Sequence, residues 1–150
     1  MTTQDKKEPL KKHAIQLEAL KVLELSIKAN PNMEDPHGQM ISETDFTMET
    51  GYSEYHKDNH KIGVRISAKV GEGQDIFPFS LRVELIGIFD VDESRFPIMH
   101  IEHWAKTNAP LVLYPYLREQ VYGLTNRAGF SGMLLPLFEI PTFKVNLHQD

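Results

Sequence analysis

Three segments of this chain alternate between apolar and polar residues, and this two-residue period limits the possible folds more than any other feature. Apolar residues or threonines occupy every second position in 44–52, 62–70 and 77–85. Successive side chains of a β-strand point to opposite faces, so this alternation is typical of a strand with one buried face and one wet face. The three segments therefore predict an antiparallel sheet that buries one side.

An earlier segment, 15–29, shows the same period with an interruption around Leu20-Lys21-Val22. Its local composition also suits a helix, because leucine, glutamate, alanine and lysine are good helix formers. We favour a strand with a bulge or kink at the interruption. The prolines and glycine of 30–38 then predict a loop.

The turns between the strands suggest how they pair. Glu72-Gly73 suits a two-residue hairpin turn in which glycine supplies a positive φ. Together with the loop 53–60, this turn predicts a three-stranded meander whose outer face mixes acids and bases. The predicted opposing pairs are Ala68–Phe77, Ile66–Phe79, Val64–Leu81, Ile62–Val83, Phe46–Ala68, Met48–Ile66, Glu49–Arg65, Asp45–Lys69 and Lys61–Glu84.

The remainder of the chain predicts helices. Pro97 can open a first helix, and Asn108 can cap a second, longer one with Pro110 in its first turn. Gly129 is suited to ending that helix. An apolar stripe at helical spacing would bury against the sheet: Leu113, Leu117, Val121 and Leu124. The prolines after Leu134 predict an extended, docked segment. Four strands followed by helices make an α+β fold.

Composition supports a single domain over 13–150 behind a flexible polar tail, 1–12. The chain has 150 residues, a net charge of −5 and no cysteine, which excludes disulfides and thiolate metal sites and suits a reducing compartment. No apolar run approaches the roughly 20 residues of a membrane helix, and no secretory signal precedes the domain, so we expect no membrane insertion. The acidic balance argues against nucleic acid as a partner.

The search for chemistry gives no catalytic residue, cofactor or metal. His100 and His103, and likewise His56 and His60, have a spacing that metal ligands can use, but neither pair has a third ligand nearby in sequence. The segment 129–132 is not a nucleophile elbow, since it follows a helix rather than a strand. We therefore expect a protein that is not an enzyme.

The second half of the chain resembles the SecB family of export chaperones. The likeness rests on 109–119, followed by 126–130 and 134–136, and extends more loosely over 13–145. The residues that carry it are Pro110, Leu113, Tyr114, Pro115, Tyr116, Arg118, Glu119, Arg127 and Phe130.

The resemblance implies a four-stranded antiparallel sheet with C-terminal helices packed on one face, and a cytoplasmic homotetramer built as a dimer of dimers. It also implies an ATP-independent holdase that binds unfolded or precursor polypeptides in apolar grooves. The groove is expected near Met33, Met40, Phe77, Phe89, Leu111, Tyr114 and Leu117.

Some positions depart from the family pattern. In the family, an acidic residue of the fourth strand helps to dock the SecA motor. At the corresponding stretch this chain has Ser80 and Arg82 in place of an apolar and acidic pair, which argues against SecA as a partner. The departures suit a divergent member, such as the SecB-like proteins of Firmicutes or those linked to toxin–antitoxin systems. Two alternatives stay open: a scaffold with one dedicated partner, and a small-molecule or metal site near His100 and His103.

Overall fold

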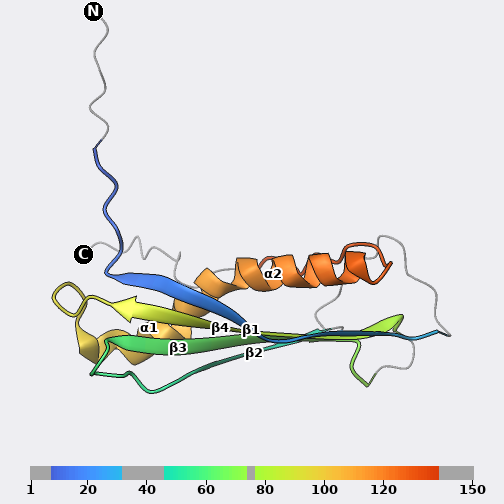
Figure 1. Ribbon diagram of the computed structural model, residues 1–150, viewed down its shortest axis with the longest axis horizontal. Coiled ribbons are helices and arrows are strands. Elements are labelled where there is room, and N and C mark those ends of the chain that lie inside the picture. The colour runs from blue at the N-terminus through green and yellow to red at the C-terminus, as the bar shows by residue number, and fades with distance from the viewer. Residues whose placement is uncertain (1–7, 32–45, 74–76, 139–150) are drawn as a thin grey trace, which may run out of the picture.

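The computed structural model describes residues 8–31, 46–73 and 77–138. A four-stranded sheet forms one layer and the helices form another (Figure 1). The elements are β1 (Ile15–Ala29), β2 (Phe46–Tyr52), β3 (Lys61–Val70), β4 (Phe79–Val91), the 3-10 helix η1 (Ile98–His100), α1 (Ile101–Thr107) and α2 (Ala109–Arg127).

All strand pairs are antiparallel, in the order β1-β4-β3-β2. The alternation predicted from the sequence is visible in β4, where every second residue from Phe79 to Val91 is buried or faces the buried side. Leu113, Leu117 and Val121 of α2 are fully buried, and α2 contacts β3, β4 and β1. The predicted α+β fold, a four-stranded antiparallel sheet with C-terminal helices on one face, is confirmed.

Segment 15–29 is a strand, as favoured, and its pairing with β4 shifts twice. The register moves between Leu17 and Ala19 and again between Val22 and Glu24. Each shift inserts one extra residue into β1, which is how a bulge keeps apolar residues on the buried side after a break in the alternation. The observed irregularities therefore lie on either side of the predicted interruption.

The predicted pairing of β3 with β4 is wrong by six residues. Ile66 lies opposite Leu85 rather than Phe79, and Ile62 lies opposite Phe89 rather than Val83. The reason is a longer connection: β3 ends at Val70 and β4 begins only at Phe79, with Gly71 and Gly73 both at positive φ. A shift by an even number keeps apolar residues opposite apolar ones, so hydrophobic pattern alone cannot detect it.

Two smaller corrections follow from the same ambiguity. Phe46 lies opposite Val70, so the predicted pairing of β2 with β3 was wrong by two residues. The expected pairing of Lys61 with Glu84 is also wrong, because Lys61 binds Glu18 while Glu84 lies 3.4 Å from Arg65. The remaining predicted partner, Asp45, lies outside the described residues.

The helices begin and end where the sequence suggests. Pro97 precedes η1, Asn108 precedes α2, and Gly129 has a φ of +91° just after α2. Asn108 does not cap α2 through its side chain, because its Oδ1 accepts a hydrogen bond of 2.7 Å from the Thr107 hydroxyl. Asn108 therefore occupies the N-cap position without a side-chain hydrogen bond to the first turn of α2.

One glycine sets how closely α2 approaches the sheet. A Cβ atom at Gly87 would lie 2.6 Å from Cδ2 of Leu113 and 3.0 Å from Cδ1 of Leu17. No side chain fits in that space without moving its neighbours. Gly87 thus lets the N-terminal part of α2, around Leu113, lie directly on β4.

Candidate functional site

An apolar cavity of about 660 Å³ lies on one flank of α2. Ile15 and Leu17 of β1, Phe89 of β4, and Val112 and Tyr116 of α2 line it. We call the surface formed by these five residues the open flank. Polar residues line it as well: His13 just before β1, Gln16 of β1, and Asn108 just before α2. A concave, mainly apolar surface with few polar groups is typical of a binding site.

The end of this cavity is made rigid by aromatic packing. Trp104 of α1 also lines it and contacts Phe89 edge-on, with ring centroids 5.0 Å apart. His13 stacks on Trp104, with ring centroids 6.4 Å apart. Such contacts stabilise a pair beyond the area they bury. Three packed rings, those of His13, Trp104 and Phe89, therefore form one end of the cavity.

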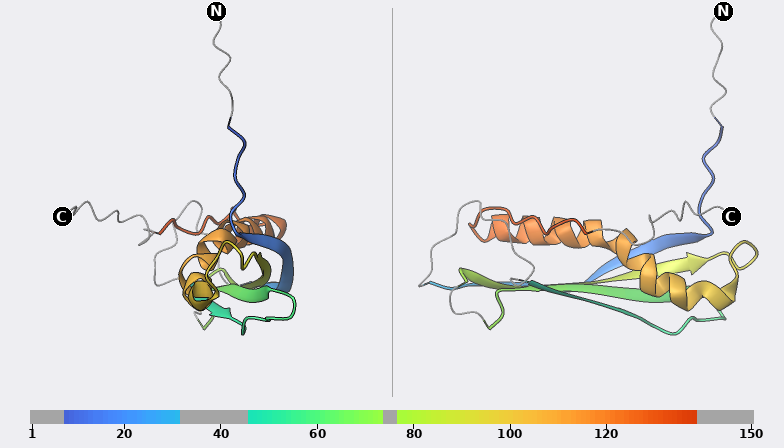
Figure 2. Two further views of the ribbon diagram at one scale, coloured as in Figure 1. Left: turned by 90° about the vertical axis from the view of Figure 1, so that its left-hand side faces the viewer. Right: turned by 180° about the vertical axis from the view of Figure 1, so that it is seen from behind.

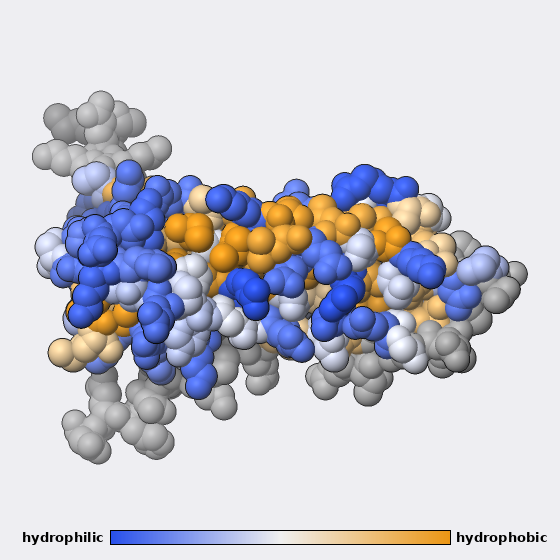
Figure 3. Space-filling view, turned by 60° about the horizontal axis from the view of Figure 1, so that its bottom comes forward, coloured by the Kyte–Doolittle hydropathy of each residue, from blue (hydrophilic) through white to orange (hydrophobic). Residues whose placement is uncertain are grey.

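Apolar surface continues along β1 beyond the cavity. Leu20, Val22 and Leu25 lie opposite the inward-facing residues of β4, yet each stays more than a third exposed. Apolar residues also gather in a band along the length of the molecule, with hydrophilic residues around it (Figure 3). In the described part of the chain β1 is an edge strand, so the backbone N–H and C=O groups on its outer side face no neighbouring strand.

The other flank of α2 is covered by the chain itself. Residues after α2 turn back and run alongside the helix (Figure 2). Leu135 is 1% exposed, its carbonyl accepts a hydrogen bond of 2.9 Å from Nε of Arg118, and the Tyr114 hydroxyl donates to the carbonyl of Pro136. Phe138 then packs between Tyr114 and Phe46, with ring centroids 5.6 and 6.1 Å away. We call residues 131–138 the return segment and this side of α2 the covered flank.

Burial has an electrostatic consequence on the covered flank. Desolvation raises the pKa of the Tyr114 hydroxyl, and the nearby Arg118 guanidinium opposes this shift. The hydroxyl therefore stays protonated and remains a hydrogen-bond donor at neutral pH. Both side chains hold the return segment through main-chain carbonyls, a form of recognition that does not depend on sequence.

The residues predicted for a groove are divided among these surfaces. Phe89 and Leu111 line the same cavity on the open flank. Tyr114 lies under the return segment, while Leu117 is fully buried between α2 and the sheet. Phe77 lines a separate pocket of about 330 Å³.

Met33 and Met40 lie outside the described residues, so the groove as a whole stays a prediction. The sequence reasoning did not single out Val112 and Tyr116 as groove residues. Their spacing of four residues beside the buried stripe was the available signal.

Ser80 and Arg82, predicted at the docking position, lie on the face of the sheet away from α2. Arg82 is exposed, and its Nε atom lies 3.8 Å from Oε1 of Glu72. Ser80 borders the pocket of Phe77. The outer face therefore mixes charges, as the sequence suggested, although its particular pairs differ.

The described histidines do not gather into a metal site. In the described ranges, no group of three or more histidine, cysteine or acidic residues could hold a metal ion. His60 instead lies 3.0 Å from Glu93, which accepts a hydrogen bond of 2.5 Å from Tyr55. The bonds from Tyr55 and His60 lower the pKa of Glu93, and burial followed by the Glu93 contact raises that of Tyr55. This cluster links the loop after β2 to the turn after β4.

No helix in the described parts of the chain is long and apolar enough to span a membrane.

Comparison with known proteins matches this architecture to one family. The family model "Preprotein translocase subunit SecB" matches residues 8–142. The protein-export protein SecB of Saccharophagus degradans is 27% identical over 111 residues, which are 74% of this chain and 58% of that protein. The SecB of Histophilus somni is 27% identical over 125 residues, covering 81% of this chain and 70% of that protein.

A solved structure shares the fold. The SecB-like chaperone of Mycobacterium tuberculosis, determined in complex with a peptide from an antitoxin, has a TM-score of 0.65 and 22% sequence identity. The alignment covers 83% of this chain and 91% of that one. Since the family model spans every strand and helix described above, this chain belongs to the SecB family.

Proposed function

We propose that this chain is an ATP-independent chaperone that holds unfolded or precursor polypeptides in extended form. The observation that carries the proposal is the open flank, an apolar cavity of about 660 Å³ beside α2 whose helix residues Val112 and Tyr116 stay exposed. Burial of apolar surface contributes roughly 25 cal/mol per Å² before ordering costs, so such a surface can retain a client without a nucleotide.

The covered flank supports this mode of binding. There, α2 already holds an extended apolar segment, with Leu135 buried and two main-chain carbonyls bound by Tyr114 and Arg118. Family membership supports the same reading.

The proposal extends to assembly and location. Exposed apolar residues on the edge strand β1, among them Leu20, Val22, Leu23 and Leu25, suit burial against a second copy. We propose a homotetramer, arranged as a dimer of dimers, that acts in the cytoplasm. We do not extend the proposal to the SecA motor, because Arg82 places a cation on the outer face.

Suppression of aggregation by the purified protein tests the proposal. An unfolded client diluted from denaturant should aggregate more slowly at a stoichiometric ratio of chaperone, and mass measurement should show a tetramer that gains the client. Val112→Glu should remove most of the protection, because it places a charge in the apolar cavity. Met99→Glu is the matched control, since Met99 is 81% exposed on η1, away from the cavity. Aggregation that proceeds unchanged with wild-type protein would refute the proposal.

The alternative is a protein with one dedicated partner. The complex of the M. tuberculosis relative with a peptide from an antitoxin favours it, because one defined segment is bound there. Comparison of several unrelated unfolded clients separates the two readings. A holdase should protect most of them, whereas a dedicated protein should protect one and leave the others to aggregate.

A further inference from the structure

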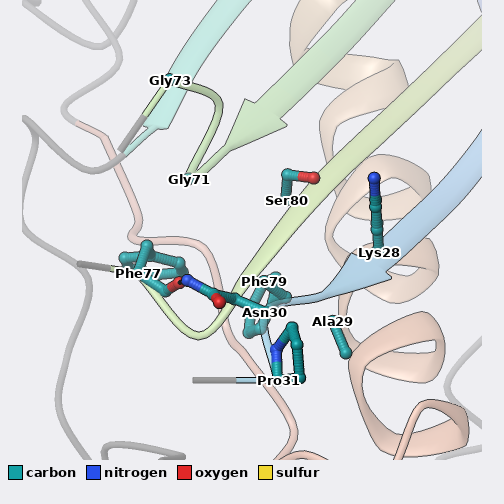
Figure 4. Close-up of a pocket in the computed structure, with 9 residues that line it drawn as sticks. All are labelled: Lys28, Ala29, Asn30, Pro31, Gly71, Gly73, Phe77, Phe79 and Ser80. Atoms are coloured by element: carbon teal, nitrogen blue, oxygen red, sulfur yellow. Dashed lines mark hydrogen bonds between the residues drawn. The ribbon is translucent and has the colours of Figure 1, made fainter. Parts of the chain in front are cut away.

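The two edge strands of the described sheet differ in regularity. β1 shifts its register against β4 twice, and its end is tied down by the Asn30 side chain, which donates to the Phe77 carbonyl at 3.3 Å (Figure 4). β2 pairs with β3 without a shift from Phe46 to Tyr52, and this strand contains no proline, lysine or bulge. Those features usually keep an edge strand from pairing with another chain. The outer backbone groups of β2 therefore form a regular row that a further strand can bind.

The inner face of β2 is incompletely covered at the same place. Met48 lies opposite Ala68 and Tyr52 lies opposite Val64, and both partners on β3 are buried. Met48 nevertheless stays 38% exposed and Tyr52 44% exposed. A strand added at this edge would extend the inner face and bring new side chains beside both residues. Such a strand needs an apolar residue at every second position.

The described part of the return segment ends beside this edge. Phe138 packs on Phe46, the first residue of β2, and residues 139–150 lie outside the described residues. An extended chain advances about 3.3 Å per residue, and neighbouring strands lie about 4.8 Å apart. The three residues 139–141 are therefore enough to bring the chain from Phe138 to the edge. A chain that continues from there towards Tyr52 runs parallel to β2.

The sequence that follows has the required alternation. Phe143, Val145 and Leu147 are separated by single polar residues, and phenylalanine, valine and threonine favour strands. Pro141 comes directly before this alternation, where a strand tolerates a residue without an N–H group. Residues 142–147 thus read as a short strand with one apolar face, and their length matches the seven residues of β2.

We propose that residues 142–147 pair with β2 as a fifth, parallel strand that closes this edge of the sheet. The apolar residues extend the inner face beside Met48 and Tyr52, and Lys144 then lies on the outer face next to Glu49. Opposite charges on neighbouring strands stabilise a sheet. The occupant is the chain's own segment, because a short tether holds it at a roughly millimolar effective concentration, ahead of a second copy or a free partner. This strand acts independently of client binding and leaves β1 as the edge that is open to assembly.

Hydrogen exchange of the full chain, resolved at single amides, tests the pairing. Alternate amides of β2 point away from β3, and we expect them to be protected in the wild type. Val145→Asp should speed their exchange by about tenfold or more, because a charge replaces the apolar side chain that holds the added strand. Asn146→Asp adds the same charge on the opposite face of that strand, and it should leave the exchange nearly unchanged. Amides of the central strand β4 should exchange at the wild-type rate in both variants, which confirms that the domain stays folded.

A charge swap then tests the position of the added strand. Lys144→Glu should speed exchange of the same β2 amides by a few-fold, and adding Glu49→Lys to that variant should restore the protection. Restoration requires the two side chains to be neighbours, since net charge alone would not produce it. Loss without restoration would overturn the proposed pairing.

Three other results would also overturn the proposal. Fast exchange of the outward amides of wild-type β2 would mean that the edge is open. Protection that falls on dilution, equally in the wild type and in Val145→Asp, would assign the edge to a second copy. Protection that appears only after an unfolded client is added would assign it to that client. Because the first measurements contain no client, failure of this pairing is distinguishable from failure of the proposed chaperone function.

Discussion

The two flanks of α2 carry similar apolar surface, yet one is covered and the other is open. On the covered flank, the return segment buries Leu135 and offers its carbonyls to Tyr114 and Arg118. On the open flank, Val112 stays 41% exposed beside a cavity that also contains Tyr116. The difference teaches that α2 presents apolar surface on both sides, and that the described part of the chain covers only one of them.

This comparison assigns different properties to the two flanks. Contacts on the covered flank exist within one chain, so changes there should alter the free energy of unfolding. Surface on the open flank has no partner from within the described chain, so changes there should alter binding and leave stability almost unaffected. The predictions below follow this division, from the largest expected change in stability to the smallest.

Leu135→Ala should cost about 2–5 kcal/mol of unfolding free energy, because it leaves a cavity under the return segment. Urea denaturation measures the loss. Leu137→Ala is the matched control: Leu137 is 77% exposed, and its truncation should change stability by less than about 0.5 kcal/mol. Equal effects of the two variants would show that the return segment is not docked as described.

Gly87→Ala should destabilise the chain by about 1–3 kcal/mol, since the new methyl group would lie 2.6 Å from Leu113 and would push α2 off the sheet. Both flanks should change together, so client binding should weaken as well. Gly51→Ala serves as the control, because nothing lies within 4 Å of a Cβ atom there. If Gly87→Ala is as stable as Gly51→Ala, the seating of α2 does not depend on that close approach.

Tyr114→Phe should cost about 0.5–1.5 kcal/mol, because the half-buried carbonyl of Pro136 loses its donor. Thermal denaturation measures the loss, and limited proteolysis should cut the return segment faster. Tyr116→Phe removes the same hydroxyl from the open flank and should leave both measurements unchanged. A similar loss from each tyrosine would contradict the difference between the flanks.

Sequence reasoning predicted the fold well because its strongest signals are local. Alternation marks the strands, and Asn108 and Gly129 mark the ends of α2. Pairing is not local: shifting β3 against β4 by six residues leaves every apolar residue opposite another, so the wrong register satisfied the same pattern. The predicted and the observed register differ only in the length of the connection between Val70 and Phe79. Gly71 and Gly73 are both compatible with more than one turn, so the sequence did not define that length.

The candidate site was predicted less completely for a related reason. The predicted groove residues Phe89 and Leu111 line one cavity, but helical spacing cannot say which side of the Leu113–Leu117 stripe stays open. Which side stays open depends on where the return segment packs. Its prolines predicted an extended segment but did not indicate on which side of α2 it would lie. Tyr114 was consequently assigned to a client groove, while the structure places it under the chain's own residues.

Val112→Asp should give the smallest change in stability and a large change in binding. Val112 is already partly exposed, so a polar replacement should alter the unfolding free energy by less than about 0.5 kcal/mol. The same carboxylate would have to be desolvated whenever an apolar client enters the cavity, and this cost should prevent binding. Aggregation assays and urea denaturation on one preparation should therefore diverge. If the variant instead unfolds as readily as Leu135→Ala, the open flank is part of the stabilising core. The distinction between the covered flank and the open flank of α2 then does not hold.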